Sequence, residues 1–384
     1  MASRLYEIKV GELKKLLKRA YLTGDRDSKL ILGAPGIGKS EMLKELAAEL
    51  AKELGKEFVE YDDSVADTIL ARPEDYFVLV DVRLTEVEPS DLIGLPREVN
   101  GYVKYKPLLW AVVLSKCAGI LFLDELTNVQ RLDVQTVMYK LMLDKKVGFT
   151  KLNKDVMVIA AGNEPEHSSV ATELPAPVIN RVDVYYARVA DVDEWKDWMD
   201  EKFGDGWDKR VYAYVKARPQ HFLMKPERAE TLEQFATPRR WTSLALVTKG
   251  MNVDNEMMDY IAYSKVGSEA AAGFLSFIRV PVMKFEDLLK EPEKWHELKE
   301  ESKYMTMVLA IAKIEEMIDA GKIKEMVGFI KELLDNDREF LSIMVAMMSE
   351  GTRLKFAMLA PRVPELKGFV EYIKSVRNKL IGDE

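Results

Sequence analysis

The chain has 384 residues, of which 48% are hydrophobic and 31% charged, and its formal net charge is −8. This length and composition indicate a globular protein of two or three domains and exclude a disordered chain. The negative charge argues against an extended surface that coats nucleic acid, while leaving room for a local basic patch.

The single cysteine and the apolar runs indicate the cellular compartment of the protein. The single cysteine, Cys117, excludes an intramolecular disulfide and a cysteine metal cluster, and its apolar surroundings predict a buried thiol. The N-terminus carries no signal-peptide pattern. The longest apolar stretch, residues 108–123, is interrupted by Ser115 and Lys116 and is too short to span a bilayer. The sequence therefore predicts a cytoplasmic protein without a membrane segment.

Strand and helix patterns alternate along the first half of the chain. Residues 1–28 are predicted to form a short amphipathic helix, Lys14–Tyr21, and a turn. The helices that follow are expected at 40–54, 108–116 and 131–143, and the strands at 30–32, 76–83, 119–123, 156–161 and 182–189. Near-continuous apolar strands separated by helices predict an α/β fold with a parallel sheet covered on both faces. Beyond Asp191 only helical periodicity remains.

The segment Gly33–Ser40, GAPGIGKS, fits the phosphate-binding pattern G-x-x-x-x-G-K-[ST] at every fixed position. A strand leads into it and a helix leads out, which is the context that the pattern requires. Its backbone N–H groups are expected to surround phosphate oxygens, with the Lys39 ammonium on the β- and γ-phosphates and the Ser40 hydroxyl on Mg²⁺. The alternative is a glycine-rich turn with a stray lysine. The candidate nucleotide contacts are Gly33, Pro35, Gly36, Ile37, Gly38, Lys39, Ser40 and Glu41.

Two later strands end in polar residues. The run GILFLDELTN places Asp124 and Glu125 at the end of an apolar strand, where Asp124 would reach Mg²⁺ and Glu125 would polarise the attacking water. The run VMVIAAGNEPE ends in Asn163, which would hold that water or the γ-phosphate. The alternatives are two solvated acids that cap a strand and a Gly162-Asn163 turn.

In order and content these motifs resemble the AAA+ ATPases, and the segments Val82–Pro96 and Leu123–Gly148 resemble the MoxR-like branch of that family. The resemblance implies a P-loop α/β domain over residues 1–190, an all-α lid over 191–270 and a C-terminal helical accessory region over 271–384. It also implies Mg²⁺-dependent ATP hydrolysis by a hexameric ring that remodels a partner protein. That partner is a von Willebrand factor A domain protein in many members of the family.

The resemblance assigns two arginines. Pro175–Val184 matches a helix that ends in an arginine finger, so Arg181 would reach the γ-phosphate held by a neighbouring subunit. Thr237–Ser243 matches the sensor 2 motif and places Arg239 on the phosphates of its own subunit, with Arg240 as the adjacent alternative. The alternative for Arg181 is an arginine at a helix end that forms a surface ion pair. The alternative for Arg239 and Arg240 is a solvated pair that binds no phosphate.

Two hairpins are predicted, and in MoxR-like proteins both face a central pore. Glu98–Val103 contains an Asn-Gly turn between β-prone segments, and Lys145–Leu152 has Gly148 at its centre. Ordinary solvated loops are the alternative. The candidate client contacts are Tyr102, Tyr105, Lys145, Lys146, Phe149 and Lys151.

Other functions on the same fold stay open. A nucleic-acid motor or loader would need a basic surface, which the lysines of the second hairpin provide only in part. A nucleotide-gated scaffold without turnover is disfavoured by Asp124 and Glu125, and a small-molecule kinase leaves both arginine motifs unexplained.

The methionines Met344, Met347 and Met348 lie at helical spacing and predict a helix core, with a client-docking surface as the alternative.

Overall fold

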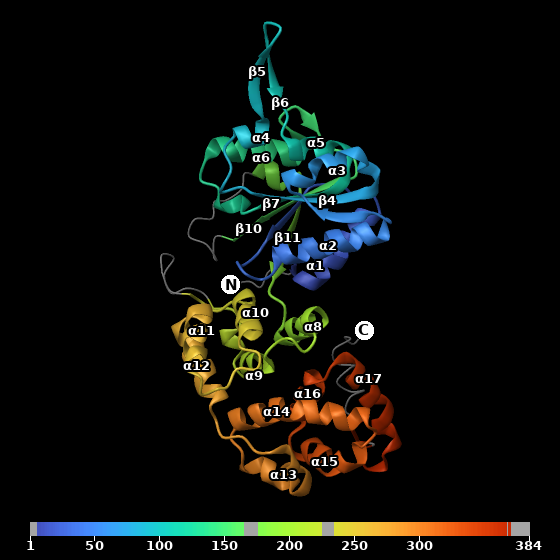
Figure 1. The fold of residues 1–384 in the computed structure, drawn as a ribbon, viewed down its shortest axis with the longest axis vertical. Helices are drawn as coiled ribbons and strands as arrows, with labels where there is room; N and C mark the ends of the chain where they lie inside the picture. Colours follow the sequence, from blue (N-terminus) through green and yellow to red (C-terminus); the bar gives the residue numbers. More distant parts are fainter. Residues whose placement is uncertain (1–5, 165–175, 225–233, 367, 370–384) are drawn as a thin grey trace. The chain divides into compact units, whose positions relative to one another are not determined.

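The computed structural model describes residues 6–164, 176–224, 234–366 and 368–369. These residues fall into two compact units, of which the first ends at Ala190 and the second begins at Asp191. The first unit combines a sheet with helices, and the second is helical (Figure 1).

A seven-stranded sheet forms the centre of the first unit. Its order is β1-β11-β2-β10-β7-β4-β3, and every neighbouring pair is parallel, which confirms the predicted sheet. From β2 the chain moves to the β3 edge and later returns to both sides of β2, so the direction of winding changes there. Open α/β sheets bind ligands at such a point. The strands are β1 (Glu7–Lys9), β2 (Lys29–Leu32), β3 (Glu57–Glu60), β4 (Tyr76–Arg83), β7 (Ala118–Asp124), β10 (Val156–Gly162) and β11 (Asp183–Arg188).

Helices cover both faces of this sheet (Figure 1). Because successive side chains of a strand point to opposite faces, each central strand supplies two cores. Val78, Leu121 and Val158 pack in one core with Met138 and Leu141. This double cover explains why the central strands are continuous apolar runs. One layer contains α1 (Val10–Leu22) and α2 (Lys39–Glu53), and the other contains α3 (Ala66–Ala71), α5 (Leu109–Lys116) and α6 (Leu132–Asp144).

The sequence does not predict the two edge strands. The segments Glu-Ile-Lys of β1 and Glu-Phe-Val-Glu of β3 are short and carry charges at their ends, so no apolar run marks them. Charged residues on an edge strand oppose pairing with another sheet. The interpretation of residues 1–28 as only a helix and a turn is therefore wrong, because β1 precedes the helix and pairs with β11.

Both predicted hairpins are confirmed. Strands β5 (Leu95–Val99) and β6 (Tyr102–Lys106) are antiparallel and joined by Asn100 and Gly101, whose φ values of 54° and 79° suit a two-residue hairpin turn. Figure 1 shows this hairpin projecting from the body of the first unit. The second hairpin pairs β8 (Lys146–Val147) with β9 (Thr150–Lys151).

The two hairpins contact each other through aromatic rings. The ring centroids of Tyr105 and Phe149 lie 5.3 Å apart, although Phe149 is 78% exposed. Lys145 does not share this exposed surface, because its ammonium donates to the carbonyl of Arg26 and burial lowers its pKa. Lys145 is half-buried, so its role as a client contact stays a prediction, while Lys146, Phe149 and Lys151 are exposed.

The second unit is built from helices packed around aromatic side chains. In one aromatic cluster, the Tyr214 ring centroid lies 5.5 Å from that of Trp241, 5.7 Å from that of Phe274 and 5.5 Å from that of Phe277. The helices are α8 (Val192–Phe203), α9 (Lys209–Ala217), α10 (Pro238–Val247), α11 (Glu256–Val266), α12 (Ser268–Ile278), α13 (Phe285–Lys290), α14 (Glu300–Asp319), α15 (Val327–Asn336), α16 (Arg338–Met347) and α17 (Glu350–Leu359).

This unit contains the described parts of both the predicted lid and the predicted accessory region. The boundary proposed after residue 270 falls inside α12, so the division of the unit into two domains stays a prediction. Met344, Met347 and Met348 are buried, as expected of a helix core. Within the described ranges of the chain, no helix has both the length and the apolar character that a bilayer crossing needs.

Candidate nucleotide site

The segment Gly33–Ser40 joins the end of β2 to the start of α2. Gly36 and Gly38 adopt positive φ values of 75° and 98°, a left-handed conformation that glycine reaches without steric cost. Gly38 is the N-cap of α2, so the first backbone N–H groups of the helix have no partner within the helix. The curled loop and the helix N-terminus together form a cradle of N–H donors that favours an anion.

Lys39 folds back into this loop. Its side chain is buried, and its ammonium lies 2.7 Å from the carbonyl oxygen of Gly33 and 3.1 Å from that of Ala34. The same nitrogen lies 3.4 Å from Oδ1 of Asn163, which follows β10. The structure thus brings together two residues that the sequence predicts for the phosphate site, one at the start of α2 and one just after β10, which neighbours β2 in the sheet.

Ser40 and Asp124 meet beside the loop. The Ser40 hydroxyl lies 3.2 Å from Oδ2 of Asp124, the last residue of β7. Another carboxyl, that of Asp81 on β4, is close enough that its pKa is raised, first by burial and then by the charge of Asp124. Sequence reasoning missed Asp81, because it lies within an apolar strand. Hard oxygen groups of this kind are the ligands that Mg²⁺ prefers.

Glu125 is held in a strained turn just after β7. Its φ of 61° is rare for a residue with a side chain, and its backbone N–H donates to Oδ1 of Asp124 at 2.9 Å. The Thr85 hydroxyl donates to the Glu125 carboxylate at 2.8 Å, and the Arg83 guanidinium lies 4.0 Å from it. The last residue of β4, Arg83, and Thr85 just after it therefore lie against the predicted base. No motif in the sequence indicates either of them.

The backbone of Asn163 is held in place by Thr127. The backbone N–H of Asn163 donates to the Thr127 hydroxyl at 2.8 Å, and Thr127 is buried. Thr127 belongs to the turn after Asp124 and Glu125, so the segment that carries the acids also anchors the asparagine. Nothing in the sequence pattern distinguishes Thr127 from an ordinary turn residue.

Arg181 stands apart from this group. It follows the one-turn helix α7 (Ala176–Ile179), and the first residue of the matching motif, Pro175, lies outside the described residues. The Arg181 side chain is exposed and has no hydrogen-bond or ion-pair partner in the part of the chain that the structure describes.

The double arginine lies in the second unit, at the start of α10. Thr237 caps the helix by accepting from the backbone N–H of Arg240, and Pro238 occupies the first turn. The Arg240 guanidinium donates to Gln234. Arg239 is exposed and has no side-chain partner among the described residues, and its role as a phosphate ligand stays a prediction.

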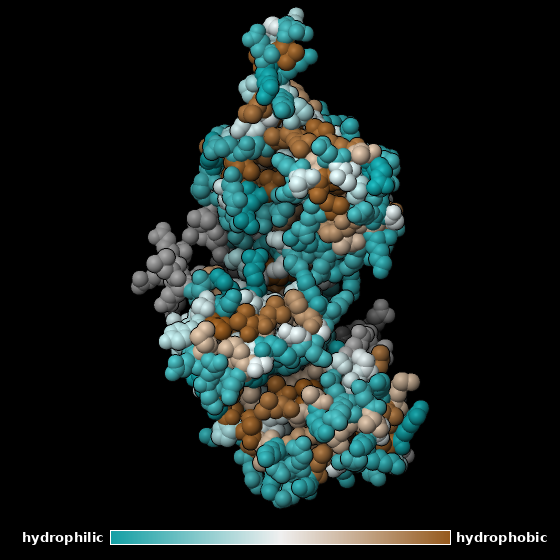
Figure 2. All heavy atoms as spheres, viewed as in Figure 1, coloured by the Kyte–Doolittle hydropathy of each residue, from teal (hydrophilic) through white to brown (hydrophobic). Residues whose placement is uncertain are grey.

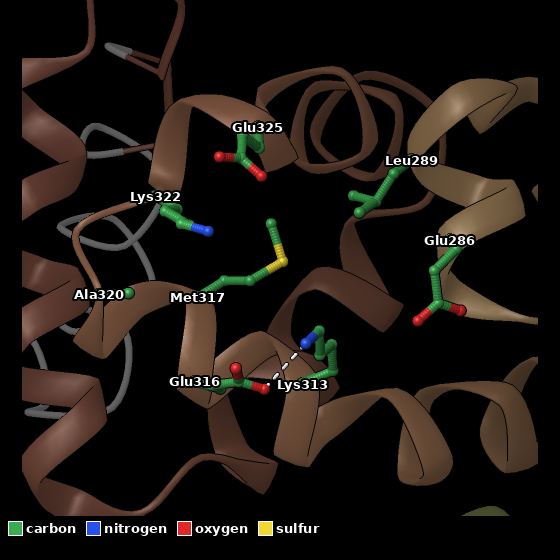
Figure 3. Close-up of a pocket in the computed structure, with 8 residues that line it drawn as sticks. All are labelled: Glu286, Leu289, Lys313, Glu316, Met317, Ala320, Lys322 and Glu325. Atoms are coloured by element: carbon green, nitrogen blue, oxygen red, sulfur yellow. Dashed lines mark hydrogen bonds and ion pairs between the residues drawn. The ribbon is translucent and has the colours of Figure 1, made fainter.

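A pocket of about 310 Å³ lies elsewhere in the second unit (Figure 3). Met317 points into it, and the Lys313 ammonium at its rim pairs with Glu316 at 2.9 Å. With three glutamates in its lining, the pocket lacks the convergent cations that a triphosphate needs. Its lining residues are Glu286, Leu289, Lys313, Glu316, Met317, Ala320, Lys322 and Glu325.

Comparisons with known proteins bear on the first unit. Residues 29–187 match the family model of the ATPase family associated with various cellular activities (AAA). The chain contains an AAA ATPase domain. This domain spans β2 to β11 and includes the loop, both acids, Asn163 and Arg181.

No curated protein matches the chain. Among solved structures, a RuvB mutant of Thermotoga maritima is similar at 16% identity, covering 76% of this chain and 81% of that one, with a TM-score of 0.36. The ORC2 protein of Aeropyrum pernix is similar at 14% identity, covering 98% and 87%, with a TM-score of 0.38. NtrX of Brucella abortus is similar at 14% identity, covering 94% and 68%, with a TM-score of 0.35. Likeness at this level says nothing about the activity of this chain.

The residues of the AAA domain fit its cofactors, ATP and Mg²⁺. The left-handed glycines and the start of α2 form an anion cradle, and the Lys39 ammonium lies inside it. The 3.2 Å between Ser40 Oγ and Asp124 Oδ2 is close to the roughly 3 Å that separates adjacent ligands of one octahedral Mg²⁺ ion. When bound, Mg²⁺ neutralises charge on the β- and γ-phosphates.

Replacing Thr85 by valine is expected to lower kcat for ATP hydrolysis by about tenfold without changing the affinity for ATP. The valine has the same shape but cannot donate to the Glu125 carboxylate, so the base loses its orientation. The serine variant keeps the hydroxyl and is expected to retain activity. Steady-state kinetics and nucleotide titration of both variants check this. Equal kcat values for the valine and serine variants would show that Thr85 does not position Glu125.

Proposed function

We propose that this chain is an ATPase that assembles into a hexameric ring of the MoxR-like type and uses hydrolysis to remodel a partner protein. The proposal rests on one observation, the clustering of functional side chains at the carboxyl ends of the central strands. These side chains are Lys39, Ser40, Asp124, Glu125 and Asn163. A triphosphate seated there lies against a cation, metal ligands and a base. The partner class that the MoxR-like resemblance implies is a von Willebrand factor A domain protein.

Each residue of the cluster has one role in this mechanism. Lys39 and the loop N–H groups hold the phosphates, while Ser40 and Asp124 hold Mg²⁺. Glu125 accepts the proton of the attacking water, and Asn163 orients that water. The contacts of Thr85 and Thr127 fix the last two side chains, so that the base and the amide keep their positions.

Arg181 completes the site of a neighbouring subunit. A planar guanidinium spreads over the equatorial oxygens of the phosphoryl group and stabilises the charge that develops there. Support comes from its exposure and from the absence of any described partner for it within its own chain. A contribution from a neighbouring copy makes hydrolysis depend on assembly.

Arg239 binds the phosphates within its own subunit, and its replacement by alanine is expected to weaken ATP binding by about tenfold. The matched replacement of Arg240 is expected to change ATP affinity little, because its guanidinium is engaged by Gln234. Titration of each variant with a fluorescent ATP analogue measures the difference. If the Arg240 variant lost the affinity and the Arg239 variant kept it, the two assignments would be exchanged.

The paired hairpins form the surface that acts on the partner. Tyr102, Tyr105 and Phe149 are exposed apolar side chains on two segments that contact each other. Exposed aromatic residues on a projecting element are typical of a binding surface. Movement of one hairpin is transmitted to the other through the Tyr105–Phe149 contact.

A nucleic-acid motor or loader is the second candidate. The exposed cations Lys146 and Lys151 flank Phe149, and cations beside an aromatic ring bind single-stranded nucleic acid in many proteins. ATPase activity that rises with added DNA and falls again with salt would favour this function.

The test of the proposed function is the size of the assembly as a function of nucleotide. The Glu125→Gln protein, which is expected to bind ATP without hydrolysing it, should form a hexamer in MgATP as measured by mass photometry. The Lys39→Ala protein, with its phosphate cradle impaired, should not. A monomer under both conditions at high protein concentration would refute the ring.

A further inference from the structure

The hairpin β5–β6 presents all of its strand residues to solvent, since every residue of both strands is exposed. Its side chains include Leu95, Val99, Tyr102 and Val103, and Tyr102 is 73% exposed. Figure 2 shows apolar and polar residues side by side on this projection. An isolated two-stranded hairpin gains little stability from such a surface.

The register places cations together on one face. Arg97 lies directly opposite Lys104, and Lys106 follows two residues later on the same face. Like charges that face each other across strands destabilise a hairpin. Within the described part of the chain, none of these three side chains has a hydrogen-bond or ion-pair partner. An anionic ligand would remove this repulsion.

The backbone of β6 has an open edge. Pro96 has no N–H, so the pair that it forms with Tyr105 is one whose backbone groups point outward, and the same holds for the pair of Glu98 with Val103. Pro96 thereby blunts the outer edge of β5. On β6 the outward N–H and C=O groups of Val103 and Tyr105 remain available to another strand.

The opposite face of the hairpin is anchored. Tyr105 packs on Phe149 of the second hairpin, and a side chain at Gly94 would clash with the carbonyl of Lys106, so the root is tightly packed. Tyr105 lies on the face opposite Lys104 and Lys106, because successive residues of a strand alternate. The cationic face and the β6 edge near Val103 are therefore the parts free to bind.

We infer that the β6 edge binds an extended acidic segment of the partner polypeptide as an added strand, with its carboxylates on Arg97, Lys104 and Lys106. Addition of a strand supplies main-chain hydrogen bonds, and alternate side chains supply specificity. The inference rests on the proposed function in one respect, namely that the partner is a protein.

A polypeptide fits this surface better than a nucleic acid does. The open edge offers N–H and C=O groups at the spacing of a β-strand, which a sugar-phosphate backbone does not match. The aliphatic side chains of Leu95 and Val99 share the cationic face and suit apolar side chains of a peptide. The formal net charge of −8 also repels a long polyanion at distances beyond the hairpin.

The test measures peptide binding to the full chain by fluorescence anisotropy at low salt. The probe is a labelled peptide of about ten residues that alternates Glu and Thr, and the comparison probes are the Lys–Thr peptide and single-stranded oligodeoxythymidine. The Glu–Thr peptide is expected to bind most tightly. The double variant Arg97→Glu, Lys104→Glu should lose about tenfold in affinity for it and gain affinity for the Lys–Thr peptide. A matched double reversal in the second unit, Lys324→Glu with Lys331→Glu, should change neither affinity.

The open edge is tested separately. Val103→Pro removes the outward N–H without breaking a bond to β5, and it should weaken binding of the Glu–Thr peptide by about tenfold relative to Val103→Thr. Equal melting temperatures verify that both variants fold. Equal affinity of these variants, or tighter binding of oligodeoxythymidine than of the peptide, would overturn the inference. Because binding is measured without hydrolysis, failure here leaves the ATPase assays unaffected, and inactivity in those assays leaves this result unaffected.

Discussion

Replacing Glu125 by glutamine is expected to slow ATP hydrolysis by about 10³-fold while ATP still binds. The glutamine has the same size but cannot accept the proton of the attacking water, and general-base catalysis contributes about 10²- to 10⁴-fold. The Thr85 hydroxyl that donates to the carboxylate can still donate to the amide oxygen, so the local geometry is retained. Phosphate release at saturating ATP measures the rate, and nucleotide titration measures binding.

A matched control for this variant is Glu86→Gln. Glu86 is another exposed acid beside the site and pairs with Arg83 at 2.9 Å, but nothing places it on the reacting water. Its replacement removes the same charge and is expected to leave kcat within about twofold of wild type. A Glu125→Gln protein that hydrolysed ATP at the wild-type rate would show that another group is the base.

Replacing Arg181 by alanine is expected to lower kcat by about 10³-fold, with ATP affinity nearly unchanged. An arginine that reaches the phosphoryl group from a neighbouring subunit contributes about 10³- to 10⁵-fold to the rate. Lysine at this position is expected to restore little, because a point charge cannot form the paired hydrogen bonds of a guanidinium. Single-turnover hydrolysis under conditions where the ring is assembled measures this effect.

The control for Arg181 is Arg72→Ala, another exposed arginine of the first unit, which pairs with its near neighbour Asp75. Its loss should leave hydrolysis unchanged. Wild-type activity per subunit should also rise with protein concentration, since each site needs a second copy. If the Arg181→Ala protein kept the wild-type rate, the exposed arginine would have no catalytic role.

The central sheet and the P-loop were predictable because their sequence signals are local. A buried parallel strand needs a continuous apolar run, and a phosphate loop needs glycines and a lysine at fixed spacing. The edge strands β1 and β3 carry no such run, because one side of each faces solvent and the charges at their ends are tolerated there. The hairpin turn at Asn100 and Gly101 was predictable because it does carry a local signal, since few other residues adopt its backbone angles.

The supporting residues of the site were not predictable from sequence. Thr85 contacts Glu125 across 40 positions of the chain, and Thr127 contacts Asn163 across 36. Both are ordinary threonines after a strand, and only the parallel order of β4, β7 and β10 brings them beside the catalytic residues. Lys145 shows the converse, because its place in a hairpin suggested exposure while its ammonium is bonded to the carbonyl of Arg26.

The most direct measurement mixes two inactive proteins, Glu125→Gln and Arg181→Ala, and records ATP hydrolysis. In a ring, an Arg181→Ala subunit supplies an intact phosphate loop and an intact base, and a Glu125→Gln neighbour supplies an intact arginine. With random assembly of equal amounts, one interface in four combines both, so the mixture is expected to reach about a quarter of the wild-type rate. A mixture as inactive as each variant alone, although it assembles, would contradict a site shared between two copies of the chain.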